Sequence, residues 1–321
     1  MTLPERAPSA DAAALLEAAR GGQRRALARV MSMVERGGAD ARRLGMLTFA
    51  ASGHAHTVGI TGAPGAGKST LNSALVSVAR ERAERVAVLA VDPSSPFSGG
   101  AILGDRVRMT DHTFDEGVYI RSMATRGHLG GLTLATPLAV RVLDALGWPW
   151  VVVETVGVGQ VETEIAGAAD TTVVVVNPGW GDSVQANKAG LMEIADIFVV
   201  NKADRPGTPE TCRDIRQMLD LSAPGDWDPP ILTSVGTTGE GAAELWAAVC
   251  AHRTHATATG ELAAQRAARV EAELDDIVRA SISQRVATLS GSPLAQQLRE
   301  RLARRELDPY AAAEMLLAET C

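Results

Sequence analysis

Short apolar runs alternate with amphipathic stretches between about residues 58 and 251. Near-continuous runs of Val, Ile and Leu bounded by Gly, Pro or Asp are typical of strands buried on both faces of a parallel sheet. With helices between them, the pattern predicts an open, doubly wound α/β domain that binds ligands at the carboxyl ends of its strands. The runs are VGIT (58–61), VAVLAVD (86–92), WVVVE (150–154), TTVVVVN (171–177), IFVVNKAD (197–204) and ILTS (231–234).

Helical spacing of apolar residues marks both flanks of this region, over about residues 10–50 and from about residue 259 onward. We therefore expect an N-terminal helical extension (1–50), an α/β domain (51–258) and a C-terminal helical arm (259–321), the arm broken near Gly291-Ser292-Pro293. The amphipathic stripe of the arm is longer than one domain needs and predicts a homodimer. Packing on the same chain explains the stripe almost as well.

Composition narrows the class of protein. The chain is 46% hydrophobic and 21% charged, as in an ordinary globular protein, and its net charge of −7 disfavours nonspecific binding to nucleic acid or anionic membranes. No apolar run approaches the roughly 20 residues of a membrane span, and the N-terminus lacks the apolar segment of a signal peptide. Three widely spaced cysteines are typical of reduced thiols. We expect a cytoplasmic protein without a membrane or nucleic-acid partner.

A phosphate-binding motif, GxxxxGK[ST], follows the first run and opens the amphipathic stretch KSTLNSALVSVAR. In this motif, backbone N–H groups and the positive end of the helix surround phosphate oxygens. Lys68 would reach the outer phosphates, and the Ser69 hydroxyl would bind Mg²⁺. A chance glycine-rich turn is the alternative, and the strand–helix context disfavours it. The expected nucleotide contacts here are Gly62, Ala63, Pro64, Gly65, Ala66, Gly67, Lys68, Ser69 and Thr70.

A second motif, NKAD, ends the fifth run with Asn201, Lys202 and Asp204. The Asp204 carboxylate would accept hydrogen bonds from the ring N–H and the exocyclic amine of guanine. Adenine lacks this pair and would leave a buried carboxylate unpaired, so the motif favours GTP over ATP. Ser234 and Val235, after the next strand, are expected to contact the base through backbone N–H groups.

Three acidic residues are candidates for the Mg²⁺ site. Glu154 ends a buried strand and precedes a glycine-containing loop, where nucleotide hydrolases hold the ion, usually through water. Asp92 ends the second run, so it can reach the metal or orient the attacking water. Asp105 lies further along, and the residues alone leave the roles of Asp92 and Asp105 open.

These motifs, in their order and spacing, resemble the MeaB/ArgK family of methylmalonyl-CoA mutase-associated GTPases, relatives of the human MMAA protein. The resemblance covers about residues 10–320 and rests on GITGAPGAGKST, AVDPSSP, GAILGDRVRM, VETVGVGQVETEIAG, GDSVQANKAG and EIADIFVVNKADR. It implies a homodimeric GTPase that uses Mg²⁺ with GTP or GDP and gates cofactor delivery to an adenosylcobalamin-dependent methylmalonyl-CoA mutase. It also implies that Asp92, Asp105 and Glu154 join Ser69 at the metal.

The segment 179–188 is similar to the third switch of that family, which couples the nucleotide to the mutase. Of the 31 basic residues only Lys68, Lys188 and Lys202 are lysines, and the first and third lie in nucleotide motifs. By the resemblance, Asp182 and Lys188 are the charged residues that act in the switch. Our hypothesis is that Lys188 swings toward the phosphates when the partner docks. A solvated lysine at the start of a helix is the alternative.

Hydrolysis should be slow without a partner, because Val158 follows Gly157 where many GTPases place a water-orienting Gln. Two rival functions fit parts of the pattern. A nickel-type metallochaperone GTPase would need a metal-binding His or Cys cluster, which the sequence does not display. A kinase of an amino-acid transport system, an older label for the family, would need a carboxylate placed to deprotonate an acceptor.

Overall fold

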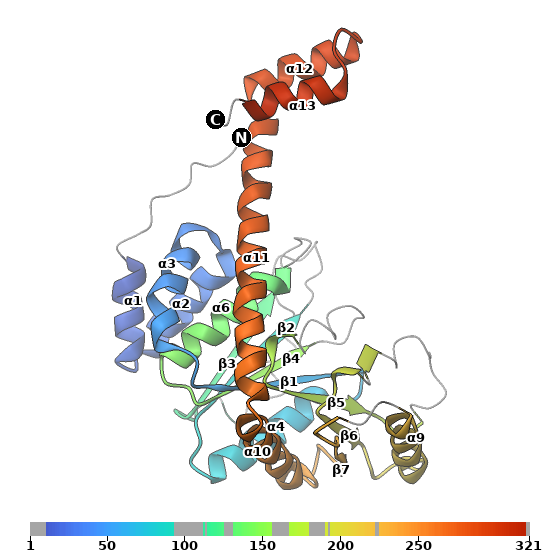
Figure 1. Ribbon diagram of the computed structural model, residues 1–321. Coiled ribbons are helices and arrows are strands. Elements are labelled where there is room, and N and C mark those ends of the chain that lie inside the picture. The colour runs from blue at the N-terminus through green and yellow to red at the C-terminus, as the bar shows by residue number, and fades with distance from the viewer. Residues whose placement is uncertain are drawn as a thin grey trace. The chain divides into compact units, whose positions relative to one another are not determined.

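The computed structural model describes residues 11–92, 112, 114–124, 131–155, 167–179, 190–191, 193–221 and 225–318. The chain divides into two compact units, Met1–Arg269 and Val270–Cys321. The first unit holds the sheet and the second holds helices alone (Figure 1). No helix in the described part of the chain is long and apolar enough to cross a membrane.

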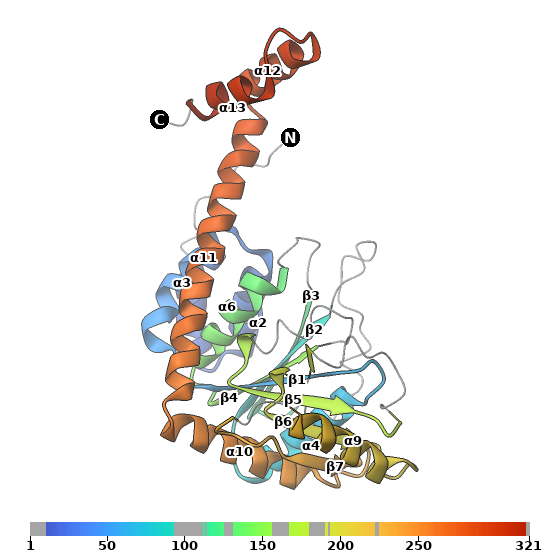
Figure 2. The same cartoon turned by 45° about the vertical axis from the view of Figure 1, so that its right-hand side comes forward.

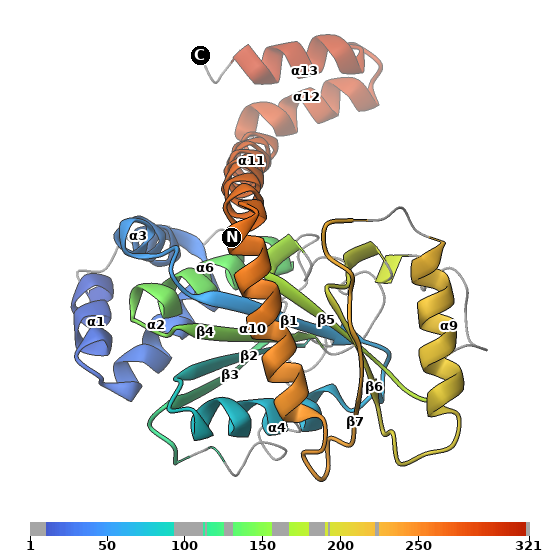
Figure 3. The ribbon, with the colours of Figure 1, turned by 60° about the horizontal axis from the view of Figure 1, so that its bottom comes forward.

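All strand pairs described in the sheet are parallel, and the strand order is β3-β2-β4-β1-β5-β6-β7. This arrangement confirms the predicted doubly wound α/β fold (Figure 3). The central strands are buried on both faces, which explains their unbroken apolar sequences. The strands are β1 (His56–Gly62), β2 (Val86–Asp92), β3 (Val118–Ala124), β4 (Trp150–Thr155), β5 (Thr171–Val176), β6 (Ile197–Asn201) and β7 (Ile231–Ser234).

Helices cover both faces of the sheet. One hydrophobic cluster joins α1–α3 and α6 to one face of β2, β3 and β4, and a second joins α4 and α10 to the opposite face. A third, smaller cluster packs Ile215 of α9 against β5 and β6. The helices of this unit are α1 (Asp11–Arg20), α2 (Arg24–Arg36), α3 (Gly38–Thr48), α4 (Lys68–Glu81), α6 (Gly131–Ala145), α9 (Thr208–Asp220) and α10 (Ala242–Ala258).

Helix α11 (Glu261–Ser290) begins in the first unit, and its residues from Val270 onward belong to the second, with α12 (Pro293–Ala303) and α13 (Pro309–Ala318). The break after α11 follows from local chemistry. The Ser292 hydroxyl accepts a hydrogen bond from the Ala295 N–H at 3.1 Å, and Pro293 occupies the first turn, so Ser292 caps a new helix. Figure 2 shows α12 and α13 beside each other.

Strand β3 is the one strand of the described sheet that the sequence analysis missed. It lies at the edge of the sheet, where β2 is its one partner among the described strands. Its sequence, VYIRSMA, mixes Tyr, Arg and Ser into the apolar run. The polar members have a structural use, since the Arg121 guanidinium pairs with Glu35 of α2 and ties the helical extension to this edge.

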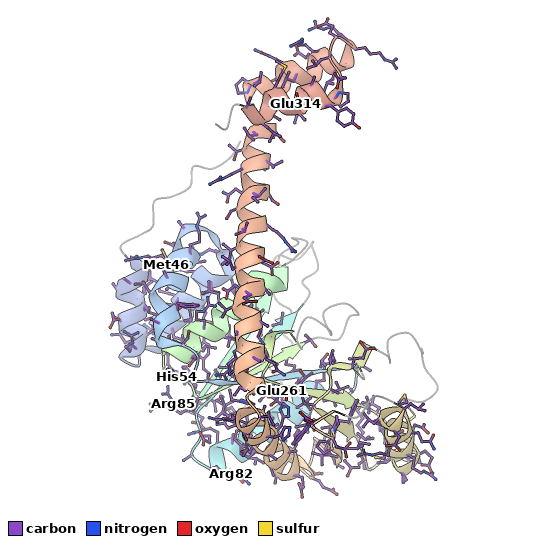
Figure 4. The ribbon with its side chains drawn as sticks, viewed as in Figure 1. Met46, His54, Arg82, Arg85, Glu261 and Glu314 are labelled. Atoms are coloured by element: carbon purple, nitrogen blue, oxygen red, sulfur yellow. The ribbon has the colours of Figure 1, made fainter. Side chains whose placement is uncertain are left out.

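A buried ion cluster joins the start of α11 to the amino ends of β1 and β5. Glu261 begins α11 (Figure 4), and Arg266 and Arg269 follow on the same helix. Both guanidinium groups bind the Asp170 carboxylate, at 2.6 and 2.7 Å, and that side chain is 2% exposed. Burial alone would raise the pKa of Asp170, but the bonds to Arg266 and the charge of Arg269 outweigh it and hold the pKa below its usual range.

His56, beside this cluster, is fully buried at the start of β1. Its Nε2 lies 2.8 Å from the Thr171 hydroxyl, and its Nδ1 lies 3.8 Å from Asp170. Burial lowers the pKa of His56 to about 4; the nearby Asp170 raises it, whereas Arg253, Arg266 and His252 lower it further. The ring is therefore neutral in the folded protein at neutral pH.

This burial makes stability depend on pH. As pH falls from the ordinary histidine pKa of about 6.5 toward about 4, the unfolded chain binds a proton at His56 and the folded chain does not. Folding should lose about 2 kcal/mol from this group between about pH 7 and about pH 4.5. Urea unfolding of the wild type and His56→Gln at both pH values measures the loss, and the variant should show a drop smaller by that amount. Equal drops in the two proteins would contradict the assignment.

Candidate nucleotide site

The phosphate-binding motif (62–69) runs from the last residue of β1 through the loop 63–67 into the first turn of α4, at the carboxyl edge of the sheet. Two glycines in it are required by close contacts. A Cβ on Gly62 would lie 2.0 Å from the Val175 carbonyl oxygen, and one on Gly67 would lie 2.4 Å from Nδ2 of Asn201. Both residues also have positive φ angles, 131° and 89°. The loop therefore packs directly on its neighbours and leads into the N-terminus of α4, where N–H groups can bind anions.

Lys68 folds back over this loop. Its ammonium donates hydrogen bonds to the carbonyl oxygens of Gly62 at 2.7 Å and Ala63 at 3.1 Å, and the side chain is 6% exposed. A positive charge is thus held beside the loop, where the outer phosphates of a nucleotide would lie.

Ser69 and Glu154 meet next to the loop although 85 residues separate them in sequence. The Ser69 hydroxyl donates to Oε1 of Glu154, and Nδ2 of Asn72 donates to Oε2 at 3.0 Å. Register explains the meeting: β1 pairs with β4 so that Ile60 lies opposite Glu154, and Glu154 is 3% exposed. A hydroxyl and a carboxylate are oxygen ligands of the kind that Mg²⁺ prefers, so these residues fit the ion.

Asn201 joins the phosphate loop to the second motif. Its Nδ2 donates to the Ala66 carbonyl at 2.8 Å, and its Oδ1 accepts from the Ser234 hydroxyl and the Gly236 N–H, both at 3.0 Å. Three loops at the carboxyl edge are therefore held by one buried side chain.

Lys202 and Asp204 follow on the same loop. Lys202 has a positive φ of 60°, and its ammonium donates to the Gly65 carbonyl at 2.6 Å, so its stem crosses the loop. Asp204 is exposed, and no hydrogen bond or ion pair engages its carboxylate within the part of the chain that the structure describes. The Asp204 side chain is therefore open to solvent two residues after Lys202, and its contact with guanine stays a prediction.

The predicted contacts of Ser234 and Val235 with the base stay a prediction. The Val235 N–H donates to the Glu240 carbonyl at 3.0 Å, and the Ser234 hydroxyl is engaged by Asn201. Sequence reasoning missed Gly236, whose N–H reaches Asn201, and also Asn72. The spacing of Asn72, three residues after Ser69 on a helix, could have revealed that it shares a face with Ser69.

The remaining predicted residues cannot be placed. Asp105, Asp182 and Lys188 lie outside the described residues. Asp92 is the last residue of β2, next to β4, and its side chain is likewise outside the described part. Their roles stay predictions.

A search of solved structures supports the fold. A crystal structure described as LAO/AO transport system kinase has a TM-score of 0.70 and 25% sequence identity, and the match covers 99% of both chains.

Sequence comparisons identify the family. A Pyrococcus horikoshii protein named as a candidate GTPase is 48% identical over 94% of this chain and 96% of its own length. The mouse methylmalonic aciduria type A homolog is 34% identical over 81% of this chain and 64% of its own length. The sequence model of one family, described as methylmalonyl Co-A mutase-associated GTPase MeaB, matches residues 27–290. The phosphate loop, the Asn201 motif and these matches agree, and the chain belongs to the MeaB family of GTPases.

Proposed function

We propose that this protein hydrolyses GTP to GDP and phosphate, and that its nucleotide state gates adenosylcobalamin loading of methylmalonyl-CoA mutase and protects that enzyme. The observation that carries the GTPase proposal is the Asn201 junction. A 2.8 Å hydrogen bond from Asn201 to Ala66 holds the segment that bears Asp204 to the phosphate loop, and two bonds of 3.0 Å hold the same segment to Ser234 and Gly236. The mutase partner is supported by the description of the family and by the name of the mouse relative.

The site's own residues account for binding and charge stabilisation. Loop N–H groups and the Lys68 ammonium would neutralise charge that develops on the transferred phosphoryl group and the leaving GDP. Ser69 and Glu154 would hold Mg²⁺, directly and through water, with Asp92 and Asp105 as further proposed ligands. When bound, the ion would neutralise part of the negative charge of the nucleotide's phosphates. Asp92 is also our candidate for orienting the attacking water.

We assign partner coupling to Asp182 and Lys188. Movement of Lys188 toward the phosphates when the mutase docks would add positive charge at the transition state, as an arginine finger does, an effect of about 10³-fold or more in known cases. Without the partner, hydrolysis is expected to be slow because Val158 stands where many GTPases carry Gln.

The test measures GTP and ATP hydrolysis by the purified protein, alone and with methylmalonyl-CoA mutase from the same organism. Slow GTP-specific turnover that rises sharply with the mutase is the expected result. Lys188→Ala should lose the stimulation and keep the basal rate, and wild-type stimulation in that variant would exclude the role of Lys188. A rate of GTP hydrolysis that does not change when the mutase is added would exclude this partner. Transfer of labelled phosphate from GTP to an acceptor other than water would favour a kinase.

We also propose that the protein is a homodimer through α11. Apolar side chains recur along this helix at every third or fourth position and are 44–60% exposed. An apolar face of this length favours burial against a second chain. Its members are Val270, Leu274, Ile277, Val278, Ile282 and Val286.

Charges placed on this face should separate the subunits. In sedimentation velocity, the wild type should have the mass of a dimer and the double variant Leu274→Glu/Ile282→Glu the mass of a monomer, because two carboxylates cannot be buried unpaired. Ala272→Glu, an exposed position that is neither three nor four residues from any member of the apolar face, should remain dimeric. A monomeric wild type, or a dimeric double variant, would contradict the proposal.

A further inference from the structure

We infer that Asn72 is a positioning residue that holds the Glu154 carboxylate against the Ser69 hydroxyl and so builds the Mg²⁺ site. The inference rests on the proposed GTPase function. Asn72 lies in the first turns of α4, three residues after Ser69, so both side chains leave the same face of the helix. Asn72 is fully buried, and it belongs to none of the nucleotide-binding motifs of the sequence.

The two residues of α4 bind different oxygens of the Glu154 carboxylate. Ser69 donates to Oε1 and Asn72 donates to Oε2, so both oxygens of Glu154 have a donor from α4. Two donors, one on each oxygen, restrict rotation of the carboxylate about its last bond more than one donor does. A buried carboxylate also needs such donors to remain charged. Asn72 therefore sets the orientation of the acidic group next to the phosphate loop.

The Ser69 bond has a chemical consequence. A hydroxyl carries one proton and two lone pairs, and donating the proton to Glu154 turns the lone pairs away from that carboxylate. Ser69 can then offer a lone pair to a cation without breaking its bond to Glu154. Asn72 preserves this alignment because it keeps Glu154 where it accepts the Ser69 proton.

Packing alone does not account for an asparagine here. Its Oδ1 is buried and has no hydrogen-bond partner among the described residues. Such an oxygen costs about 1–3 kcal/mol, a cost that leucine, of similar shape, would not carry. The Nδ2 bond to Glu154 is the contact that a leucine could not supply.

The experiment measures the Mg²⁺ dependence of GDP binding with a fluorescent GDP analogue, for the wild type, Asn72→Leu, Glu154→Gln and the double variant. Asn72→Leu should raise the Mg²⁺ concentration for half-maximal effect by about 10-fold, the lower range for residues that orient metal ligands. GDP affinity in the presence of a chelator should be unchanged. Because Asn72 acts through Glu154, adding Asn72→Leu to Glu154→Gln should have no further effect.

Val76→Ala, a buried change on the same helix, is the matched control and should keep the wild-type Mg²⁺ dependence while lowering stability. If Asn72→Leu does not fold, Asn72→Ser, which is too short to reach Glu154, takes its place. A Mg²⁺ dependence unchanged in the Asn72 variant, or additive effects in the double variant, would overturn the inference. A wild type that binds no GDP at all would instead overturn the proposed function.

Discussion

Lys68→Met should reduce GTP hydrolysis by about 10³-fold, the range found when one charge-stabilising group is removed from a phosphoryl-transfer or acyl-transfer site. Methionine keeps the length of the stem but removes the ammonium, which now bonds the Gly62 and Ala63 carbonyls beside the loop. Single-turnover hydrolysis from bound GTP is the measurement, because it separates chemistry from binding. Turnover within a few-fold of the wild type would exclude Lys68 from charge stabilisation.

Lys68→Arg is the informative companion variant. It keeps the charge but replaces a compact ammonium with a wide planar fork. At a side chain that is only 6% exposed and packed over two carbonyls, the fork cannot take the same place. Hydrolysis should therefore remain impaired, and a fully active arginine variant would show that charge alone is sufficient. Only three of the 31 basic residues of this chain are lysines, so the variant tests why lysine and not arginine occupies position 68.

Asp204→Asn should weaken GTP binding by about 10³-fold and create a preference for xanthosine triphosphate. The carboxylate would accept two hydrogen bonds from guanine, and bonds to a charged group contribute about 1.5–3 kcal/mol each. Asparagine can accept only one of them and directs its amide N–H toward the guanine amine. Xanthine carries a carbonyl at that position, which the amide can satisfy, so the hydrogen-bond pattern matches again.

Competition binding with GTP, ATP and xanthosine triphosphate measures the change of base preference in Asp204→Asn. ATP serves as the internal control, since adenine cannot form the pair in either protein and its weak binding should not change. Asp204 is exposed, so the substitution should leave stability within about 0.5 kcal/mol of the wild type. Undiminished GTP affinity in the variant would mean that another group reads the base.

Features that depend only on residues close together in the sequence could be predicted: the strands, the phosphate-binding loop and the Asn201 motif. Each of the six apolar runs overlaps one strand of the sheet, and the glycine loop and the Asn201 motif both lie at the carboxyl edge, as parallel strands require. Edge strand β3 was missed because an edge position tolerates Tyr, Arg and Ser, which break the apolar run.

Contacts between distant segments could not be predicted in the same way. The Ser69–Glu154 bond depends on the register of β1 against β4, and the Asp170–Arg266 pair joins residues 96 apart. Strand periodicity says which residues are buried, but it does not say which strands become neighbours. Asn72 was overlooked for that reason, because its contact with Glu154 exists only when β4 lies beside α4 in the folded chain.

The Asn201 junction also sets the order in which the protein can be completed during synthesis. Asn201 bonds to Ala66 on one side and to Ser234 and Gly236 on the other, so the nucleotide site spans about half of the chain's length. A nascent chain that ends before Gly236 has its phosphate loop and Asn201 but lacks the Gly236 N–H that helps to hold Asn201 in place. Domains whose contacts span long separations also assemble late. A ligand that binds only the complete site would stabilise only chains that extend past Gly236. We therefore expect nucleotide binding to begin only after synthesis has passed Gly236.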